Sequence, residues 1–211
     1  MKIETLNPIK ILIFGDERFD FIQNIITNDL STKTSGIYSY ILTPQGKILF
    51  EIQIFLLKDC LEVICSNDQT DLLLYFEKYA KLSEVSLKKI ELDKFNFGES
   101  YLFKSLRMGK IDTNFFPHST LLPSEVHDEY INYQKGCFIG QEVVSRIKHR
   151  QLQKKIILVF ERIIPRNTKF PDNFELLNEI KNLLVLRLPK DVDFSYLEKE
   201  FDIKKIKSYL K

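Results

Sequence analysis

Glycine is scarce in this chain, and its placement limits where the backbone can turn sharply. The 211 residues include only seven glycines, and glycine adopts the left-handed conformations of tight turns more readily than any other residue. Two of the seven, Gly136 and Gly140, flank Cys137, and there is no glycine from Gln141 to Lys211. We therefore expect an unusual loop around Cys137 and a C-terminal region with few glycine-based turns.

The periodicity of apolar residues before this loop predicts an α+β fold with antiparallel sheets. Short runs alternate apolar and polar residues, as half-buried strands do, and longer runs repeat apolar residues every three to four positions, as amphipathic helices do. Thr43-Pro44-Gln45-Gly46 is predicted to turn a hairpin, with Asp16 capping the first helix and Asn67 or Asp68 the second. The predicted strands are residues 10–14, 37–42, 47–57, 61–65 and 84–92, and the predicted helices are 17–26 and 69–81.

The second half of the chain is predicted to be less regular before the Cys137 loop and richer in strands after it. Residues 95–134 show no clear period, and a helix is expected from Gln141. Strands are expected at 157–164 and 183–188, with a short helix at 194–201. We predict an α+β region over 1–155, as one unit or two interlocked subdomains, and a shortened β-rich domain over 156–211.

The composition is that of an ordinary globular chain. Hydrophobic residues make up 44% of it and the formal net charge is +2, so we expect a sizeable core, and the total charge indicates no particular partner. Residues 1–8 lack both the continuous apolar stretch of a secretory signal and the pattern of an organelle leader. No apolar run approaches the roughly 20 residues that span a bilayer. We expect a cytoplasmic protein that does not bind membranes.

The sequence predicts no permanent metal. Its three cysteines are fewer than the four thiolates that usually hold an iron–sulfur cluster. Cys60 and Cys65 lie on or next to one predicted strand, at positions whose side chains face opposite ways. His118, His127 and His149 lack the spacing of a zinc site.

The segment around Cys137 has the features of a reactive thiol. A helix is predicted to begin just after it, and the free N–H groups of a helix N-terminus, together with Lys135, favour the thiolate over the thiol. The alternative is that Cys137 is a small buried apolar side chain, as free cysteines often are. Six Lys or Arg residues but only one acid, Glu142, lie between Lys135 and Lys155. Such a basic stretch attracts a folate tail, an acidic protein surface or RNA phosphates, or is simply a solvated helix face.

The same segment carries a recognisable signature, Lys-Gly-Cys-aromatic-x-Gly-Gln-Glu. Its defining residues are Lys135, Gly136, Cys137, Phe138, Gly140, Gln141 and Glu142. It resembles the signature of the YgfZ family of folate-binding proteins, which is related to the T-protein of glycine cleavage, an aminomethyltransferase. The likeness extends over residues 9–155, through Gly15-Asp16, Thr27-Asn28-Asp29 and Leu42-Thr43-Pro44-Gln45-Gly46-Lys47.

The resemblance implies a T-protein-like fold that holds tetrahydrofolate, or another reduced folate, in a central channel. It also implies a role in assembling or repairing iron–sulfur proteins, including enzymes that modify tRNA, with Cys137 as the reactive thiol and Lys135 beside it. Iron–sulfur client proteins or the assembly machinery are the expected partners. The folate contacts that it suggests are Glu125 for the pterin ring, Asn28 and Asp29 for the cavity wall, and Arg107 or Arg146 for the tail carboxylates.

Other interpretations stay open on the sequence alone. In the simplest alternatives Asn28 and Asp29 merely end a helix and Arg107 forms a structural ion pair. A one-carbon transferase is the second functional hypothesis, with Glu51 as an acid or base, although T-proteins resemble this chain less closely here because they carry two successive carboxylates where it has Phe50-Glu51. An RNA-binding module is the third, but no regularly placed aromatic residues accompany the basic stretch. Direct DNA binding is not expected.

Overall fold

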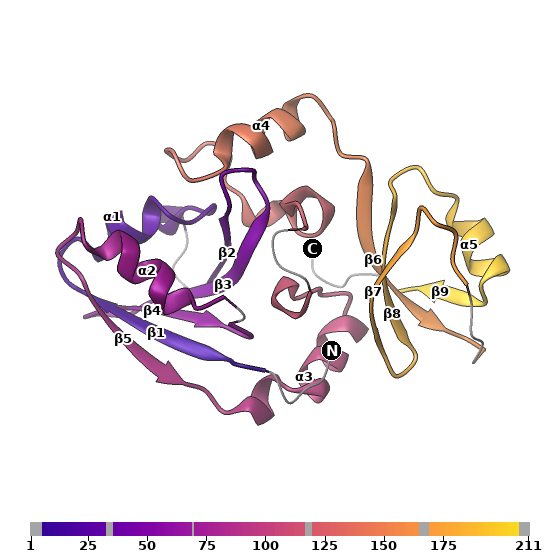
Figure 1. Ribbon diagram of the computed structural model, residues 1–211, viewed down its shortest axis with the longest axis horizontal. Helices are drawn as coiled ribbons and strands as arrows, with labels where there is room; N and C mark the ends of the chain where they lie inside the picture. The colour runs from indigo at the N-terminus through magenta and orange to yellow at the C-terminus, as the bar shows by residue number, and fades with distance from the viewer. Residues whose placement is uncertain (1–5, 33–35, 69, 117–119, 165–168, 207–211) are drawn as a thin grey trace.

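The computed structural model describes residues 6–32, 36–68, 70–116, 120–164 and 169–206, and within them the chain forms two antiparallel sheets (Figure 1). One sheet has five strands in the order β2-β3-β4-β1-β5, and the other has four in the order β7-β8-β6-β9. The α+β class expected from the sequence is confirmed. No helix within the described residues combines the length and apolar character needed to cross a membrane.

The N-terminal half of the chain forms the five-stranded sheet. Its strands are β1 Ile9–Phe14, β2 Ile37–Leu42, β3 Ile48–Leu56, β4 Leu61–Cys65 and β5 Ser86–Glu91. Helices α1 (Arg18–Gln23) and α2 (Leu72–Ala80) cover one face of it (Figure 1). Phe21 and Phe76 from these helices meet edge to face, with ring centroids 5.9 Å apart, in an apolar core shared with the strands. Burial of these alternating apolar residues is what orders the sheet.

The four-stranded sheet lies C-terminal to the Cys137 loop. Its strands are β6 Lys155–Arg162, β7 Glu175–Ile180, β8 Leu183–Pro189 and β9 Ile203–Lys205. Helix α5 (Phe194–Glu200) packs on one face through Leu197. The other face contributes Ile157 and Val185 to a central core that also contains Tyr40 of β2 and Leu102 of α3 (Glu99–Arg107). The two sheets therefore share one apolar core.

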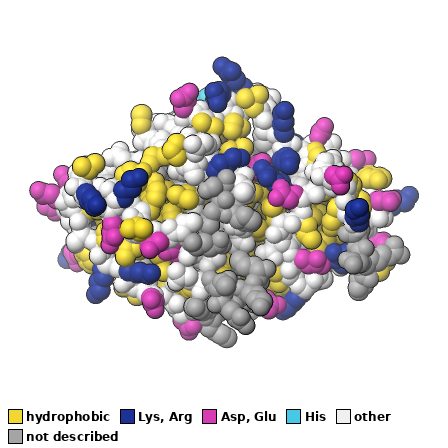
Figure 2. Space-filling view, viewed as in Figure 1, with side chains coloured by type: hydrophobic (Ala, Val, Ile, Leu, Met, Phe, Trp, Pro, Cys, Tyr) yellow, Lys and Arg dark blue, Asp and Glu magenta, His cyan; other side chains and the backbone are white. Residues whose placement is uncertain are grey.

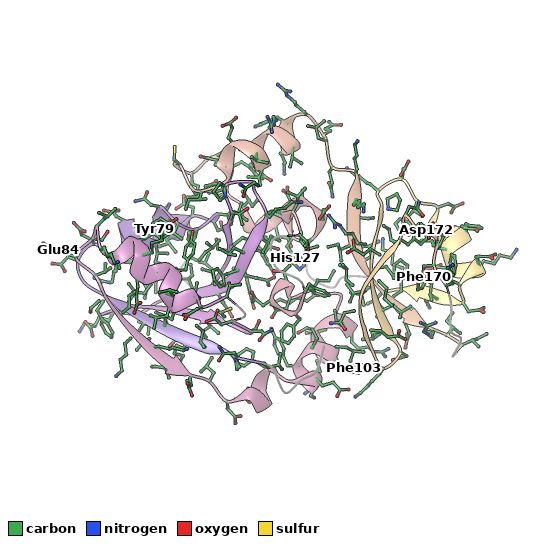
Figure 3. All side chains as sticks on the ribbon, in the orientation of Figure 1. Tyr79, Glu84, Phe103, His127, Phe170 and Asp172 are labelled. Atoms are coloured by element: carbon green, nitrogen blue, oxygen red, sulfur yellow. The ribbon has the colours of Figure 1, made fainter. Side chains whose placement is uncertain are left out.

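Short helical turns connect the strands and helices, and η4, η5 and η6 among them contact the sheets. They are η2 Leu30–Thr32, η3 Lys94–Phe97, η4 Thr113–Phe115, η5 Pro123–Glu125 and η6 Asp128–Tyr130, and α4 (Gln141–His149) follows them. His127, next to η6, lies between the two sheets (Figure 3). This connecting segment carries most of the residues discussed below.

Several predicted elements need correction. Residues 99–107 form helix α3, which was expected to be irregular, and strands β7 and β9 were not predicted. The first helix begins at Arg18 after Glu17, so the predicted cap Asp16 is wrong. Asp71 caps α2 by accepting a hydrogen bond from Leu74 N, while Asp68 accepts from Leu72 N. The predicted start of α2 at residue 69 lies outside the described residues, and the division of the chain at residue 155 stays a prediction.

Candidate functional site

Three segments far apart in the sequence converge beneath the Cys137 loop. Thr27 Oγ1 donates to Tyr130 O at 2.8 Å and accepts from Tyr40 N at 2.9 Å, while Asn132 N donates to Thr27 O at 3.0 Å. Asn28 Nδ2 donates to Tyr38 O at 2.8 Å. These buried bonds tie the Thr-Asn-Asp turn and strand β2 to the segment that leads into the loop, so the turn supports the loop.

Lys135 anchors the first end of the loop from below. Its Nζ lies 2.5 Å from Gln23 O, 2.6 Å from Ile26 O and 3.2 Å from Asn28 O, so all three N–H donors meet main-chain carbonyls. The side chain is buried, and this burial lowers the pKa of Lys135 to about 8 although Asp29 opposes the shift. Sequence reasoning placed Lys135 beside the thiol but did not predict this anchoring role.

Gly140 anchors the other end of the loop against the β2–β3 hairpin. It has φ +81°, and a Cβ at this position would lie 2.6 Å from Thr43 O. A Cβ at Gly136 would meet no atom within 4 Å. Cys137 between them is exposed, while Phe138 is buried in the central core. The loop is thus fixed at both ends and presents the thiol to solvent four residues before α4 begins at Gln141, which confirms its predicted exposure and position.

A cavity of about 550 Å³ adjoins this loop. It is lined by Phe19, Asp20, Gln23, Asp29, Leu30, Ser31, Leu56, Lys135 and Gly136. Asp29 Oδ1 accepts from Ser31 Oγ at 2.7 Å, from Ser31 N at 2.9 Å and from Gln23 Nε2 at 3.0 Å. These hydrogen bonds, with those to Ser31 the strongest cause, lower the pKa of Asp29. The cavity has the volume of a small-ligand pocket.

A second group of polar residues, the Glu51 cluster (Glu51, Tyr101, Asp112, Thr113, Asn114 and His127), lies between the sheets, and all of its members are buried except the half-buried Tyr101. Glu51 Oε2 accepts from Thr113 N at 2.8 Å and from Thr113 Oγ1 at 2.9 Å. Among the described residues no Lys or Arg forms an ion pair with Glu51. Burial, reinforced by the nearby charge of Asp112, raises the pKa of Glu51 to about 7. The carboxyl group is therefore poised to change protonation near neutral pH.

The other members of the Glu51 cluster hold its geometry. Tyr101 Oη donates to Asp112 Oδ2 at 3.0 Å. His127 Nε2 lies 2.9 Å from Ile111 O and its Nδ1 lies 3.2 Å from Glu129 Oε1. Burial lowers the pKa of His127, but the bonds and charges of Glu129 and Glu51 outweigh burial and raise it. A small cavity of about 40 Å³ touches Glu51, Tyr101 and Asp112.

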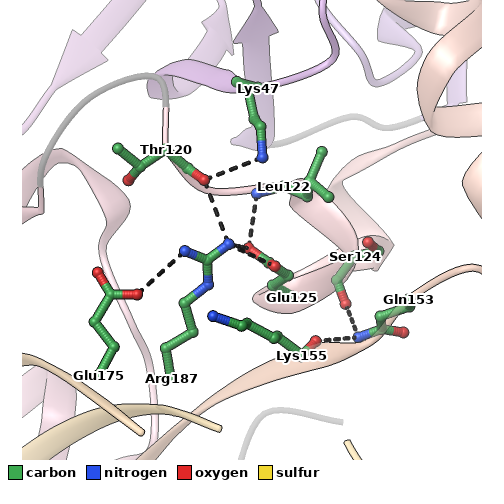
Figure 4. Close-up of polar contacts among 9 residues, drawn as sticks. All are labelled: Lys47, Thr120, Leu122, Ser124, Glu125, Gln153, Lys155, Glu175 and Arg187. Carbon is green, nitrogen blue, oxygen red and sulfur yellow. Dashed lines mark hydrogen bonds and ion pairs between the residues drawn. The ribbon is translucent and has the colours of Figure 1, made fainter. Parts of the chain in front are cut away.

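Glu125, the residue suggested for the pterin ring, already has a cationic partner. Arg187 Nη2, from strand β8, lies 2.8 Å from Glu125 Oε1 and 2.9 Å from Oε2, and Leu122 N donates to Oε2 at 3.0 Å (Figure 4). Arg187 also donates to Glu175 Oε2 at 3.3 Å. Glu125 therefore joins the connecting segment to the four-stranded sheet.

Comparisons with known proteins bear on the fold. No protein-family model matches the sequence, and no curated protein matches it. Among solved structures, the crystal structure of the glycine cleavage system aminomethyltransferase T from Bartonella henselae is similar, with a TM-score of 0.63 over 86% of this chain and 76% of that one, at 11% identity. The chain has a T-protein-like fold. At this identity the likeness shows the fold alone, in agreement with the fold implied by the sequence resemblance.

The other residues that the sequence resemblance suggested as folate contacts do not lie together. Arg107 ends α3 and pairs with Glu161 at 2.6 Å, whereas Arg146 is exposed on α4. Figure 1 places α3 and α4 on opposite sides of the molecule, so the two arginines do not lie together. Asn28 is buried beneath the loop and Asp29 lines the larger cavity.

The described residues contain no group of three or more His, Cys, Asp or Glu side chains arranged to hold a metal. Cys60 and Cys65 are buried, free thiols, and burial raises the pKa of Cys65 well above its usual value. His118 lies outside the described residues. Cys137 is the one exposed thiol in the part of the chain that the structure describes.

Sequence reasoning considered Glu51 only for the transferase alternative and did not group it with Asp112 or Tyr101. One local signal was present, because Glu51 is the one charged residue in the largely apolar strand Ile48–Leu56, and its neighbours Phe50 and Ile52 are buried. A carboxylate at such a position must find donors or shift its pKa. Asp112 gave no such signal, since it lies in an irregular segment.

Proposed function

We propose that this chain is a reduced-folate-binding accessory factor for the assembly or repair of iron–sulfur proteins, as the resemblance to the YgfZ family suggests. The observation that carries the proposal is the exposure of Cys137 on a loop anchored by Lys135 and Gly140. An exposed thiol is available to a partner's sulfur, thiol or cluster, and a fixed loop presents it in one orientation.

The Glu51 cluster fits the chemistry of a reduced folate better than Glu125 does. A pterin ring offers N–H and amino donors, which Glu51 and Asp112 would accept, while Tyr101 would contact its flat face. Tyr40 Oη is buried and has no hydrogen-bond partner among the described residues. Tyr40 does not line the small cavity, so a ligand would reach this hydroxyl group only after the surrounding side chains move.

The space beside Glu51 is smaller than the ring. Its volume of about 40 Å³ is close to the roughly 30 Å³ that one liquid water occupies. Binding would therefore require side chains that line the space, Tyr101 or Tyr38, to move. When bound, a reduced folate would supply one-carbon or redox chemistry, while Glu51 would hold or release a proton at its carboxyl group near pH 7.

The thiol role is tested by complementation in cells that lack this gene. Cys137→Ser should fail to restore the activity of iron–sulfur enzymes, whereas Gly136→Ala should restore it, because its added methyl group meets no neighbouring atom. Gly136→Ala is a matched control for change within the loop. Full restoration by Cys137→Ser would remove the thiol from the function.

The folate role is tested by anaerobic calorimetry with tetrahydrofolate. Glu51→Gln should weaken binding by about tenfold or more, because it loses a charge-assisted hydrogen bond. Replacement of the exposed Glu91 by Gln should change nothing. If a folded Glu125→Gln variant loses binding while Glu51→Gln keeps it, Glu125 is the pterin ligand instead. No detectable binding at roughly millimolar folate would exclude the cofactor.

A one-carbon transferase is the second candidate, and the raised pKa of Glu51 favours it. A carboxyl group that titrates near neutral pH is well suited to general acid–base catalysis. In that case the protein should convert an aminomethyl donor in a folate-dependent manner. Turnover should disappear in Glu51→Gln and persist in Cys137→Ser, which is the opposite of the pattern expected for the accessory factor.

A further inference from the structure

The exposed surface that continues from Cys137 along α4 is strongly basic. The helix and the residues after it expose Arg146, Arg150 and Lys154, while Glu142 is the one acid from Gln141 to Lys155. Lys148 is also exposed but forms an ion pair with Asp128. Dark-blue side chains gather along the upper rim in Figure 2, where Figure 1 places α4. We call Cys137, Arg146, Arg150, Leu152 and Lys154 the thiol strip.

From this surface we propose that the thiol strip is the docking site for an acidic segment of a partner protein, which brings a disulfide of that partner within reach of the Cys137 thiolate for thiol–disulfide exchange. The proposal rests on the proposed function of Cys137 and adds the chemistry of the partner. Helix α4 spans about 14 Å, so its exposed cations lie near enough to the loop to act on a segment that contacts both. Electrostatic attraction of this kind raises the rate of encounter more than the final affinity.

Helix stability explains only part of the charge. Cations in the last turn of a helix interact favourably with its C-terminal carbonyls, which accounts for Lys148 and contributes to the placement of Arg146. Lys154 lies beyond the end of α4 and gains nothing from that helix end. Leu152 adds an apolar contact to the strip, since it is 49% exposed.

A protein partner fits the thiol strip better than a single-stranded RNA. Proteins hold single strands by stacking bases on exposed aromatic rings. Phe138 is the one Phe, Tyr or Trp from Lys135 to Lys155, and it is buried in the central core. An acidic peptide needs no such platform, because carboxylates pair directly with arginine.

The proposal is tested by thiol–disulfide exchange with synthetic peptides. Two peptides of equal length, one rich in glutamate and one in glutamine, each carry a cysteine activated as the mixed disulfide with 5-thio-2-nitrobenzoate. The Cys137 thiolate forms a disulfide with the peptide sulfur, the original S–S bond breaks, and coloured thionitrobenzoate leaves as its thiolate. Cys60 and Cys65 are buried and serve as the unreactive background, which Cys137→Ser measures.

At low salt the glutamate peptide should react about tenfold faster than the glutamine peptide, and the ratio should approach one at about 1 M salt, where charges are screened beyond about 3 Å. The Arg146→Gln/Arg150→Gln variant should lose most of the ratio. Lys88→Gln/Lys89→Gln removes the same charge from β5, at the opposite edge of the sheet from the hairpin, and should keep it.

Three results would overturn the docking site. The first is an equal exchange rate for the two peptides, and the second is an equal loss of the rate ratio in both double variants. The third is stronger inhibition of the exchange by a single-stranded RNA than by polyglutamate of the same charge. The last result would assign the thiol strip to RNA. None of these concerns the reactivity of the thiol itself. If Cys137 instead reacts with neither peptide, the proposed function fails and not only its partner.

Discussion

Among the described residues, two glutamates, Glu51 and Glu125, are buried between the sheets, and their surroundings differ in one respect. Arg187 Nη2 donates to both carboxylate oxygens of Glu125, at 2.8 and 2.9 Å. Among the described residues, the Glu51 carboxylate accepts hydrogen bonds from the neutral N–H and hydroxyl groups of Thr113, and it lies near a second acid, Asp112. The Glu125 carboxylate has a guanidinium partner, whereas the attraction of His127 lowers the pKa of Glu51 by less than burial and Asp112 raise it.

This difference separates a structural carboxylate from a functional one. A buried carboxylate with a guanidinium partner joins two parts of a fold, and its removal mainly affects stability. A buried carboxylate without a cation has a raised pKa and destabilises the fold when ionised, which is typical of groups kept for a ligand or a reaction. Glu51 is thus the better candidate for ligand contact, and Glu125 for holding the four-stranded sheet in place.

The largest expected effect follows from breaking the Glu125 pair. Arg187→Leu leaves the Glu125 carboxylate buried without its cation, so the free energy of unfolding should fall by about 3–5 kcal/mol. Urea denaturation measures this change.

Glu175→Gln is the matched control for this pair. Glu175 contacts the same guanidinium from a side chain that is half exposed, so its replacement should change the free energy of unfolding by less than about 1 kcal/mol. A loss below about 1 kcal/mol for Arg187→Leu would mean that the pair does not stabilise the sheet interface, and the contrast between the two glutamates would disappear.

The second expected effect is a pH dependence of the free energy of unfolding that follows from the raised pKa of Glu51. Its pKa is about 7 in the fold against an ordinary value of 4.5, so the folded state binds more protons between these values. Its contribution to stability is fully present below about pH 4.5 and is lost as the pH rises through about 7. The stability of Glu51→Gln relative to wild type should therefore rise by about 3 kcal/mol from about pH 4 to about pH 8.

Urea denaturation at a series of pH values tests this expectation. Glu142→Gln changes an exposed position on α4 and is the control. Its free energy of unfolding relative to wild type should not rise by about 3 kcal/mol over this pH range. If the Glu51→Gln difference is also independent of pH, the carboxyl group titrates normally in the fold, and Glu51 is no more unusual than Glu125.

The sequence predicted the five-stranded sheet well because its strands carry a regular local pattern. The predicted limits 37–42 and 61–65 coincide with β2 and β4, where alternating apolar residues end at turn residues. The missed strand β7 is an edge strand with polar residues at half-exposed positions, so its apolar pattern is weak. Helix α3 buries Leu102 and Leu106 but lies in a largely polar stretch between two glycines, which concealed its short period.

In the candidate site, too, some features were predictable from the sequence and others were not. The Cys137 loop was predictable because its glycines, lysine and helix start are adjacent in the sequence. The distinction between Glu125 and Glu51 was not, since it depends on Arg187, which is 62 residues from Glu125, and on Asp112, which lies in a different segment from Glu51. Local patterns report which residues are polar, but only the tertiary structure shows which charges are paired.

The smallest expected effect concerns how the space beside Glu51 is closed. Tyr101 lines this space and donates a hydrogen bond to Asp112. Tyr101→Phe leaves this buried acceptor without its donor, so the free energy of unfolding should fall by about 1–2 kcal/mol. If Tyr101 must move to admit a folate ring, losing this bond makes the movement easier, and tetrahydrofolate affinity should hold or rise while stability falls. A fall in both quantities would instead mean that the Tyr101 hydroxyl group contacts the ligand or organises Asp112 for it. Calorimetry and urea denaturation on the same variant distinguish these outcomes. A Tyr101 side chain that closes the space opposes binding, whereas one that contacts the ligand supports it.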